Sequence, residues 1–262
     1  MNSLRRDFSI FLVLIRRDCK LLSSNIFSLA LDCLPALFVQ VVTFGYLFPL
    51  LGMPSSMIAP SYLGSMLSLF LQLGFTLTMK IGFDLEHNRF IDYQMMLPIS
   101  KPWLFAAYTI NNMIEIAVIT IPLLTIGVAL LHKFFIISAI NWFVVAFMYT
   151  LILTFFSTFF LAIGYTFNIT WILDNIWPRI LTPVWWISGA LMMWKKVYAW
   201  SHITAYVMLA SPMTYVAEGI RSAFIDNDQF IPWYICAVVL MMCISINCAC
   251  FMYGMKKRLD PV

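Results

Sequence analysis

The chain has 262 residues, of which 62% are apolar and only 11% are charged. Soluble domains carry about 25% charged residues, so this composition excludes an ordinary soluble protein and indicates an all-α integral membrane protein. The 16 basic and 12 acidic residues give a formal net charge of +4. That charge is too small and too scattered for a nucleic-acid-binding surface, so we expect no nucleic-acid partner.

The first 24 residues predict an amphipathic helix in the membrane interface. Apolar side chains between Leu4 and Leu22 fall within about 100° of a helical wheel, and cations occupy the other side. The cations are Arg5, Arg6, Arg16, Arg17 and Lys20. Five cations make insertion costly, so we expect residues 1–24 to lie on the membrane rather than across it.

Long uncharged runs predict six membrane spans in a single domain over residues 1–262. About 20 apolar residues suffice to cross the hydrocarbon core. A Pro- and Gly-rich turn at Pro49–Ser56 separates the first two spans. The six spans are expected at residues 26–48, 61–83, 102–131, 137–165, 176–194 and 229–255.

Two carboxylates, Asp32 and Glu115, fall inside predicted spans. A carboxylate at such a depth is costly and usually faces a helix bundle or water, so these two form a possible intramembrane polar site. The alternative for Asp32 is a position near enough to the interface to be hydrated.

An uncharged run of 21 residues, 197–217, could be counted as a further span. Ser211–Pro212 divides it, so two half-length helices that enter the membrane and return fit better, provided that protein covers their turn. Pro212 suits the first turn of the second helix, and Ser211 or Ala210 suits its N-cap. We therefore expect a re-entrant helix pair before the last span.

Glu218 and Arg221 follow Pro212 at a spacing of three residues. This spacing places both on one helix face, where they can pair. We expect the pair near the outer face, where it fixes the re-entrant helices, so that reversing both charges restores the function lost in either single reversal. The alternative is a short amphipathic helix at the membrane surface.

Six spans place both termini on one side of the membrane. That side carries 12 Lys and Arg residues and the other side carries 4. The positive-inside rule then places both termini in the cytoplasm and the protein in the inner (plasma) membrane.

Six cysteines occur without a C-x-x-C pair, and the three histidines lie far apart. We therefore expect reduced, apolar cysteines and no metal site.

The order of these features resembles the ABC-2 type permeases, the membrane subunits of ATP-binding cassette exporters. Leu97–Lys101 looks like the family's Pro-Ile-Ser-basic step into span three, and Ile187–Gly189 resembles the Ser-Gly near the end of span five. Pro212–Arg221 resembles the family's Pro–x5–Glu–x2–Arg stretch before the last span. The length is similar to that of polysaccharide, nodulation-factor and drug export permeases.

The resemblance implies a permease that moves a lipid-linked, glycan or hydrophobic substrate out of the cytoplasm. The chain lacks the G-x-x-x-x-G-K-[ST] pattern of a phosphate-binding loop, so we expect no enzyme and no cofactor of its own. A separate ATPase subunit would bind ATP and Mg²⁺. A second permease copy, most simply an identical one, and membrane lipids are the other expected partners.

Residues 86–97 belong to the longest polar connection on the expected cytoplasmic side and are predicted to form the coupling helix that contacts the ATPase. Asn88 can cap it and Pro98 ends it. Three side chains, Phe90, Tyr93 and Leu97, would share one face, ringed by Glu86, Arg89 and Asp92. The alternative is a solvated loop without a partner.

Two other function classes compete with this hypothesis. An ion-coupled secondary transporter would use Asp32 and Glu115, although no internal repeat links them. An intramembrane enzyme is less consistent with the sequence, since neither G-x-S-x-G nor H-E-x-x-H occurs.

Overall fold

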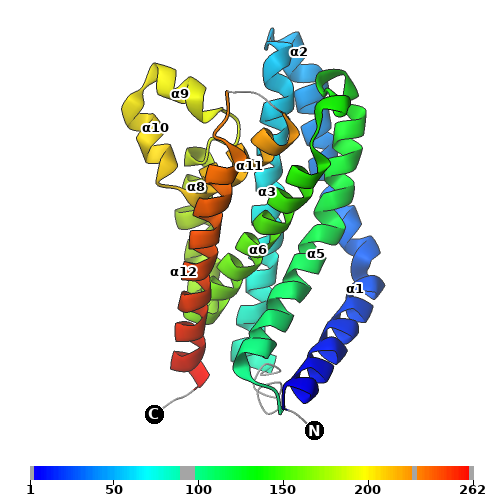
Figure 1. The fold of residues 1–262 in the computed structure, drawn as a ribbon, viewed down its shortest axis with the longest axis vertical. Coiled ribbons are helices and arrows are strands. Elements are labelled where there is room, and N and C mark those ends of the chain that lie inside the picture. Colours follow the sequence, from blue (N-terminus) through cyan, green and yellow to red (C-terminus); the bar gives the residue numbers. More distant parts are fainter. Residues whose placement is uncertain (1–2, 89–97, 226–228, 260–262) are drawn as a thin grey trace.

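The computed structural model describes residues 3–88, 98–225 and 229–259, which form helices and turns and contain no β-strand. Figure 1 shows the helices running along one long axis. The N-terminal half contains α1 (Ser3–Val42), the π-helix η1 (Thr43–Leu47), α2 (Phe48–Leu50), α3 (Ser55–Phe83), the π-helix η2 (Asp84–Asn88) and α5 (Lys101–Leu130). After two 3-10 turns, η3 (His132–Phe134) and η4 (Ile137–Ala139), come α6 (Trp142–Thr166), α7 (Ile169–Trp171), the π-helix η5 (Ile172–Leu181), α8 (Thr182–Ile187), α9 (Trp194–Trp200), α10 (His202–Leu209), α11 (Pro212–Phe224) and α12 (Trp233–Leu259).

Within the described ranges, five helical stretches are long and apolar enough to cross a membrane. They are Cys33–Leu50, Ser55–His87, Lys101–Leu130, Trp142–Thr166 and Trp233–Met255. These stretches overlap the first four and the last of the predicted spans. The chain is therefore an all-helical membrane protein.

The first predicted boundary differs from the structure. Residues 1–24 and 26–48 were expected to form separate elements, but α1 continues without a break from Ser3 to Val42. Ser23 and Ser24 donate their hydroxyls to carbonyls three residues earlier in the same helix, so they do not interrupt it. The first half of α1 also packs on α5 through Phe11, whose ring centroid lies 5.3 Å from that of Trp103.

The structure also differs from the span that the sequence predicts at residues 176–194. Helix begins earlier, at Ile169, and ends at Ile187, through α7, η5 and α8 in succession. Pro178 lies inside η5; it has no N–H and its ring clashes with the carbonyl four residues before it, which favours a widened π-helical turn. Gly189, with a φ of 66°, ends the segment in the left-handed region.

The predicted break at Ser211–Pro212 is confirmed, but a second break at Ser201 divides the region into three short helices, α9 to α11, where two were expected. Helix α10 ends at Leu209, and α11 begins at Pro212 with Ser211 at the N-cap position. Ser211 makes no side-chain capping bond. Instead, the Thr214 hydroxyl donates to the Met208 carbonyl at 2.5 Å and ties the start of α11 to the end of α10.

Helix α6 lies at the centre of the bundle, where it packs against α3, α5, α11 and α12. Its Phe156 and Phe160 are fully buried, and the Phe156 ring stacks on Phe70 of α3 at 5.2 Å. Large apolar side chains remain exposed on the outer helices, for example Phe27 and Phe38 of α1 and Ile246 of α12. Such apolar outer faces suit contact with lipid hydrocarbon.

The bundle has two distinct ends. The start of α1, the start of α5 and the end of α12 lie together at the lower end in Figure 1, which we call the N-terminal end. The short helices α2, α9 and α11 lie at the other end, which we call the far end. The start of α1 and the end of α12 therefore lie at the same end of the bundle, while the side of the membrane to which each terminus belongs is part of the proposal below.

Candidate functional site

Helix α11 carries Glu218 and Arg221 into the interior of the far end. The side chains of Arg221 and Glu218 are 0% and 1% exposed, and Arg221 Nη1 lies 2.8 Å from Glu218 Oε1. The predicted pairing at a spacing of three residues is therefore confirmed. Helix α11 is buried within the bundle along most of its length, which disfavours the alternative of a helix exposed at the membrane surface.

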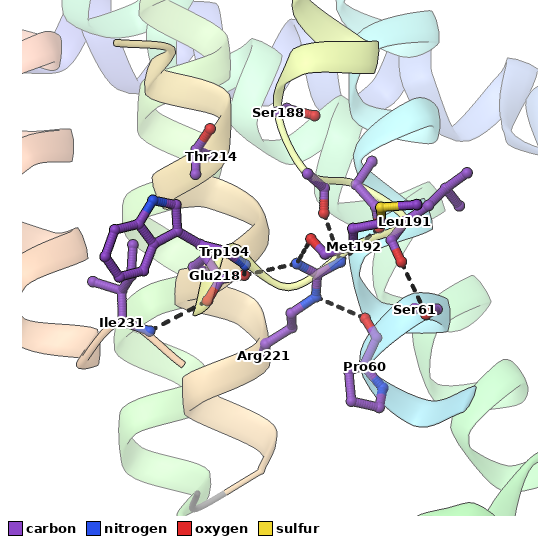
Figure 2. A network of polar contacts seen from close by, with 12 residues as sticks. Pro60, Ser61, Ser188, Leu191, Met192, Trp194, Thr214, Glu218, Arg221 and Ile231 are labelled. Carbon is purple, nitrogen blue, oxygen red and sulfur yellow. Dashed lines mark hydrogen bonds and ion pairs between the residues drawn. The ribbon is translucent and has the colours of Figure 1, made fainter. Parts of the chain in front are cut away.

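The Arg221 guanidinium uses all of its donors, as Figure 2 shows. An arginine has five N–H groups, and each one here has an acceptor. Besides Glu218, the acceptors are four backbone carbonyls: Pro60 at 2.8 Å from Nε, Gly189 and Ala190 at 2.8 and 2.6 Å from Nη2, and Met192 at 3.1 Å from Nη1. One side chain thus joins α11, α3 and the loop between α8 and α9.

The neighbouring helix α3 leaves room for this guanidinium at Gly64. A Cβ atom at this position would lie 2.1 Å from Arg221 Nη2 and 2.1 Å from the Ala190 carbonyl oxygen. Only a residue without a side chain fits there. One turn earlier, the Ser61 hydroxyl donates to the Leu191 carbonyl at 3.1 Å, so α3 holds the same loop a second time.

The Glu218 carboxylate binds backbone N–H groups on the other side of α11. Its Oε1 accepts from the Trp194 N–H at 3.1 Å, and its Oε2 accepts from the Ile231 N–H at 3.2 Å. Trp194 begins α9, where the first N–H groups have no partner within the helix. The carboxylate therefore fixes both the start of α9 and the segment that leads into α12.

These contacts make the Glu218–Arg221 network a structural clamp. Every donor of the guanidinium is used inside the protein, so the clamp offers no free donor to a substrate. It joins α11 to α3, to the α8–α9 loop with the start of α9, and to the segment before α12. The pairing of Glu218 with Arg221 could be predicted from the sequence. Their carbonyl and N–H partners could not, because every residue type carries the same main-chain groups.

A second group of charged residues lies toward the N-terminal end, between α1, α3 and α5. Glu115 of α5 forms an ion pair with Lys80 of α3. Asp18 of α1 forms an ion pair with Arg17 at 2.6 Å and accepts a hydrogen bond from the Asn111 amide of α5. Of these residues, only Glu115 was expected to form a polar site; the adjacent amides Asn111 and Asn112 inside an apolar span are a further sequence signal for this group.

Two of the other predicted sites lie partly beyond the described residues. Asp32 belongs to α1, but its side chain is outside the described set, so its pairing with Glu115 into one polar site stays a prediction. Five of the coupling residues, Arg89, Phe90, Asp92, Tyr93 and Leu97, also lie outside the described residues. The sixth, Glu86 in η2, accepts the Ile169 N–H at 2.8 Å and so connects the end of α3 to α7.

The described residues contain no cluster of three or more His, Cys, Asp or Glu side chains suited to a metal ion. No family model, curated protein or solved structure matches the chain. The function must therefore be argued from the architecture.

Proposed function

We propose that the chain is the membrane permease subunit of an ABC-2 type exporter. It would move a lipid-linked, glycan or hydrophobic substrate out of the cytoplasm, driven by ATP hydrolysis in a separate ATPase subunit. The observation that carries the proposal is the order of elements near the C-terminus. A helix ending at Ser188-Gly189 is followed by three short helices, α9 to α11, and then by the long α12, with the Glu218–Arg221 pair on the last short helix.

In this proposal the helical segment Ile169–Ile187 is the fifth of six spans, and α9 to α11 form the re-entrant element at the outer face. The N-terminal end is cytoplasmic by the positive-inside rule, because 11 basic residues then lie on that side, 4 lie on the other, and Arg179 lies within the Ile169–Ile187 span. The Glu218–Arg221 clamp supports such an element, because backbone that does not span the membrane must have its polar groups satisfied by protein.

The proposed assembly contains two permease copies and two ATPase subunits in the inner (plasma) membrane. Residues 86–97, which begin within η2 and lead toward α5, would receive the force from the ATPase. Glu86 supports this role, because its bond to Ile169 transmits a displacement of the connection to the start of the Ile169–Ile187 segment.

Co-purification tests the proposal. The chain, expressed with a P-loop ATPase encoded beside it, is expected to elute in mild detergent as a complex of two permease and two ATPase chains that hydrolyses ATP. Transport by the permease alone, driven by an ion gradient, would contradict the proposal and favour the secondary transporter.

The double substitution Phe90→Ala/Tyr93→Ala is expected to uncouple this complex. Removing two apolar anchors from a groove-binding helix weakens docking, and single aromatic anchors commonly contribute 2 kcal/mol or more, roughly a 30-fold loss of affinity. The measurement is ATPase binding and substrate-stimulated hydrolysis. The matched control is Phe143→Ala/Tyr234→Ala, which removes two exposed aromatics from the first turns of α6 and α12 and should leave both ATPase binding and hydrolysis unchanged. Equal effects of the two double variants would place the coupling site elsewhere.

A further inference from the structure

The first half of α1 turns its acidic and its basic side chains to opposite sides. Asp7 is buried, and Asp18 accepts a hydrogen bond from the Asn111 amide of α5, so both carboxylates face the bundle. Arg16 and Lys20 are exposed, and on a helix of 3.6 residues per turn each points about 160° away from Asp18. The outward face of α1, at the edge of the bundle in Figure 1, therefore carries cations without neighbouring carboxylates.

Arg16 and Lys20 lie one helical turn apart, and their charges are not neutralised within the protein. Side chains four residues apart on a helix are neighbours, and two like charges at this spacing repel each other. Neither residue forms an ion pair with any acid that the structure describes, whereas Arg17 between them is paired with Asp18. An anion placed between the two cations would remove their repulsion.

Directly beyond Lys20, the same face of α1 becomes apolar. None of the next 11 residues is charged, and Phe27 and Leu31 are 74% and 49% exposed. These two side chains and the two cations fall within a sector about 60° wide. Leu31 lies about 16 Å beyond Lys20 along the helix axis, which matches the hydrocarbon of one leaflet, about 15 Å. The face thus combines a cationic end with an apolar strip one lipid chain long.

We propose that this face of α1 binds an anionic phospholipid, with the lipid phosphate between Arg16 and Lys20 and an acyl chain along Phe27 and Leu31. A guanidinium binds two phosphate oxygens at once, and a lysine ammonium adds a point charge. A zwitterionic headgroup brings a cation of its own, which the pair repels, so a headgroup of net negative charge is preferred. This inference is independent of the exporter proposal, since it does not depend on what the protein transports.

Thermal unfolding of the delipidated full-length protein in nonionic detergent at low ionic strength tests the inference. Phosphatidylglycerol and phosphatidylcholine with the same acyl chains are titrated separately, and the midpoint of each rise in Tm gives the apparent affinity. Two cations near an anionic headgroup should make phosphatidylglycerol bind about 30-fold more tightly than phosphatidylcholine. Equal affinities for the two lipids would overturn the proposal.

Two further titrations separate a lipid site from a simple anion site. In 1 M salt, where charges are screened beyond about 3 Å, the preference for phosphatidylglycerol should shrink toward 1. Inorganic phosphate at the same concentration should not raise Tm, because it has no chain to cover Phe27 and Leu31. A rise with inorganic phosphate equal to that with phosphatidylglycerol would show that the cations bind any phosphate, and the lipid would be the wrong occupant.

The double variant Arg16→Gln/Lys20→Gln should lower the preference for phosphatidylglycerol to less than about 3-fold, the loss of most of the gain expected from two cations. Without added lipid its Tm should stay unchanged, because both side chains are exposed. The control of equal charge is Arg5→Gln/Arg6→Gln, two exposed residues of the same helix about 15 Å or more from Arg16 along its axis. This control should keep the preference. A preference that survives the Arg16/Lys20 variant, or that the control loses equally, would overturn the site.

Discussion

Arg221→Met is expected to lower the free energy of unfolding by about 3–5 kcal/mol, the cost of breaking a buried ion pair from one side. The substitution keeps an apolar chain of similar length but removes all five donors. Glu218 then stays buried without its cation, and four carbonyls lose a partner at once. Arg221→Lys should retain only part of the wild-type stability, because an ammonium has three donors and lacks the planar fork of a guanidinium.

The measurement is the fraction of monodisperse protein in detergent after heating, followed by size-exclusion chromatography. Arg16→Met is the matched control, since Arg16 is exposed on the first half of α1 and exposed substitutions usually stay within about 0.5 kcal/mol. In detergent without added lipid, Arg16→Met therefore serves as the neutral variant. If Arg221→Met and Arg16→Met lose the same amount of folded protein, the clamp does not stabilise the fold.

The structure reverses the expected outcome of the charge swap. A sequence-based interpretation expects Glu218→Arg/Arg221→Glu to restore what each single reversal removes. In the structure, the swapped carboxylate would face the carbonyls of Pro60 and Ala190, and the swapped guanidinium would face the N–H groups of Trp194 and Ile231. We expect the double variant not to recover the lost stability, because the carboxylate would then face hydrogen-bond acceptors and the guanidinium would face hydrogen-bond donors. Folded protein at the wild-type level in the double variant would contradict the clamp.

Gly64→Ala is expected to be nearly as damaging as the loss of Arg221. The new Cβ would lie 2.1 Å from the Ala190 carbonyl oxygen and from Arg221 Nη2. Neither atom can move away cheaply, since one is backbone and the other is held by two carbonyls. Overpacking of this kind typically costs about 1–3 kcal/mol and occasionally more, and displacement of the guanidinium adds the loss of its hydrogen bonds.

Gly82→Ala is the matched control, on the same helix and also buried. Its Cβ would lie 2.8 Å from Cδ1 of Ile169, the end of a flexible side chain. A small shift of that methyl group suffices, and alanine gains about 0.5–1 kcal/mol over glycine inside a helix, so the net change should be close to zero. Tm values of the two variants in detergent decide the matter; equal losses would show a general intolerance of α3 rather than contact with the clamp.

The sequence by itself determined those features that depend on apolar length and on local backbone chemistry. Uncharged runs of about 20 residues located the helices α3, α5, α6 and α12, because hydrocarbon excludes charge over a fixed thickness. Pro212 located the start of α11 for an equally local reason, since its missing N–H is tolerated only in the first turn. The i,i+3 spacing also predicted the Glu218–Arg221 pair.

Only the tertiary structure decided where those local elements meet. The continuity of α1 depends on packing against α5, which the pattern of residues 1–24 does not contain. The burial of Arg221 depends on the carbonyl of Pro60, 161 residues away, and on the loop 29–32 residues before it. The Asn111 amide reaches the Asp18 carboxylate, 93 residues away, only because α1 packs against α5. Every residue type carries the same backbone acceptor, so the sequence does not show which carbonyls a buried side chain will meet. Only the folded chain brings the two together.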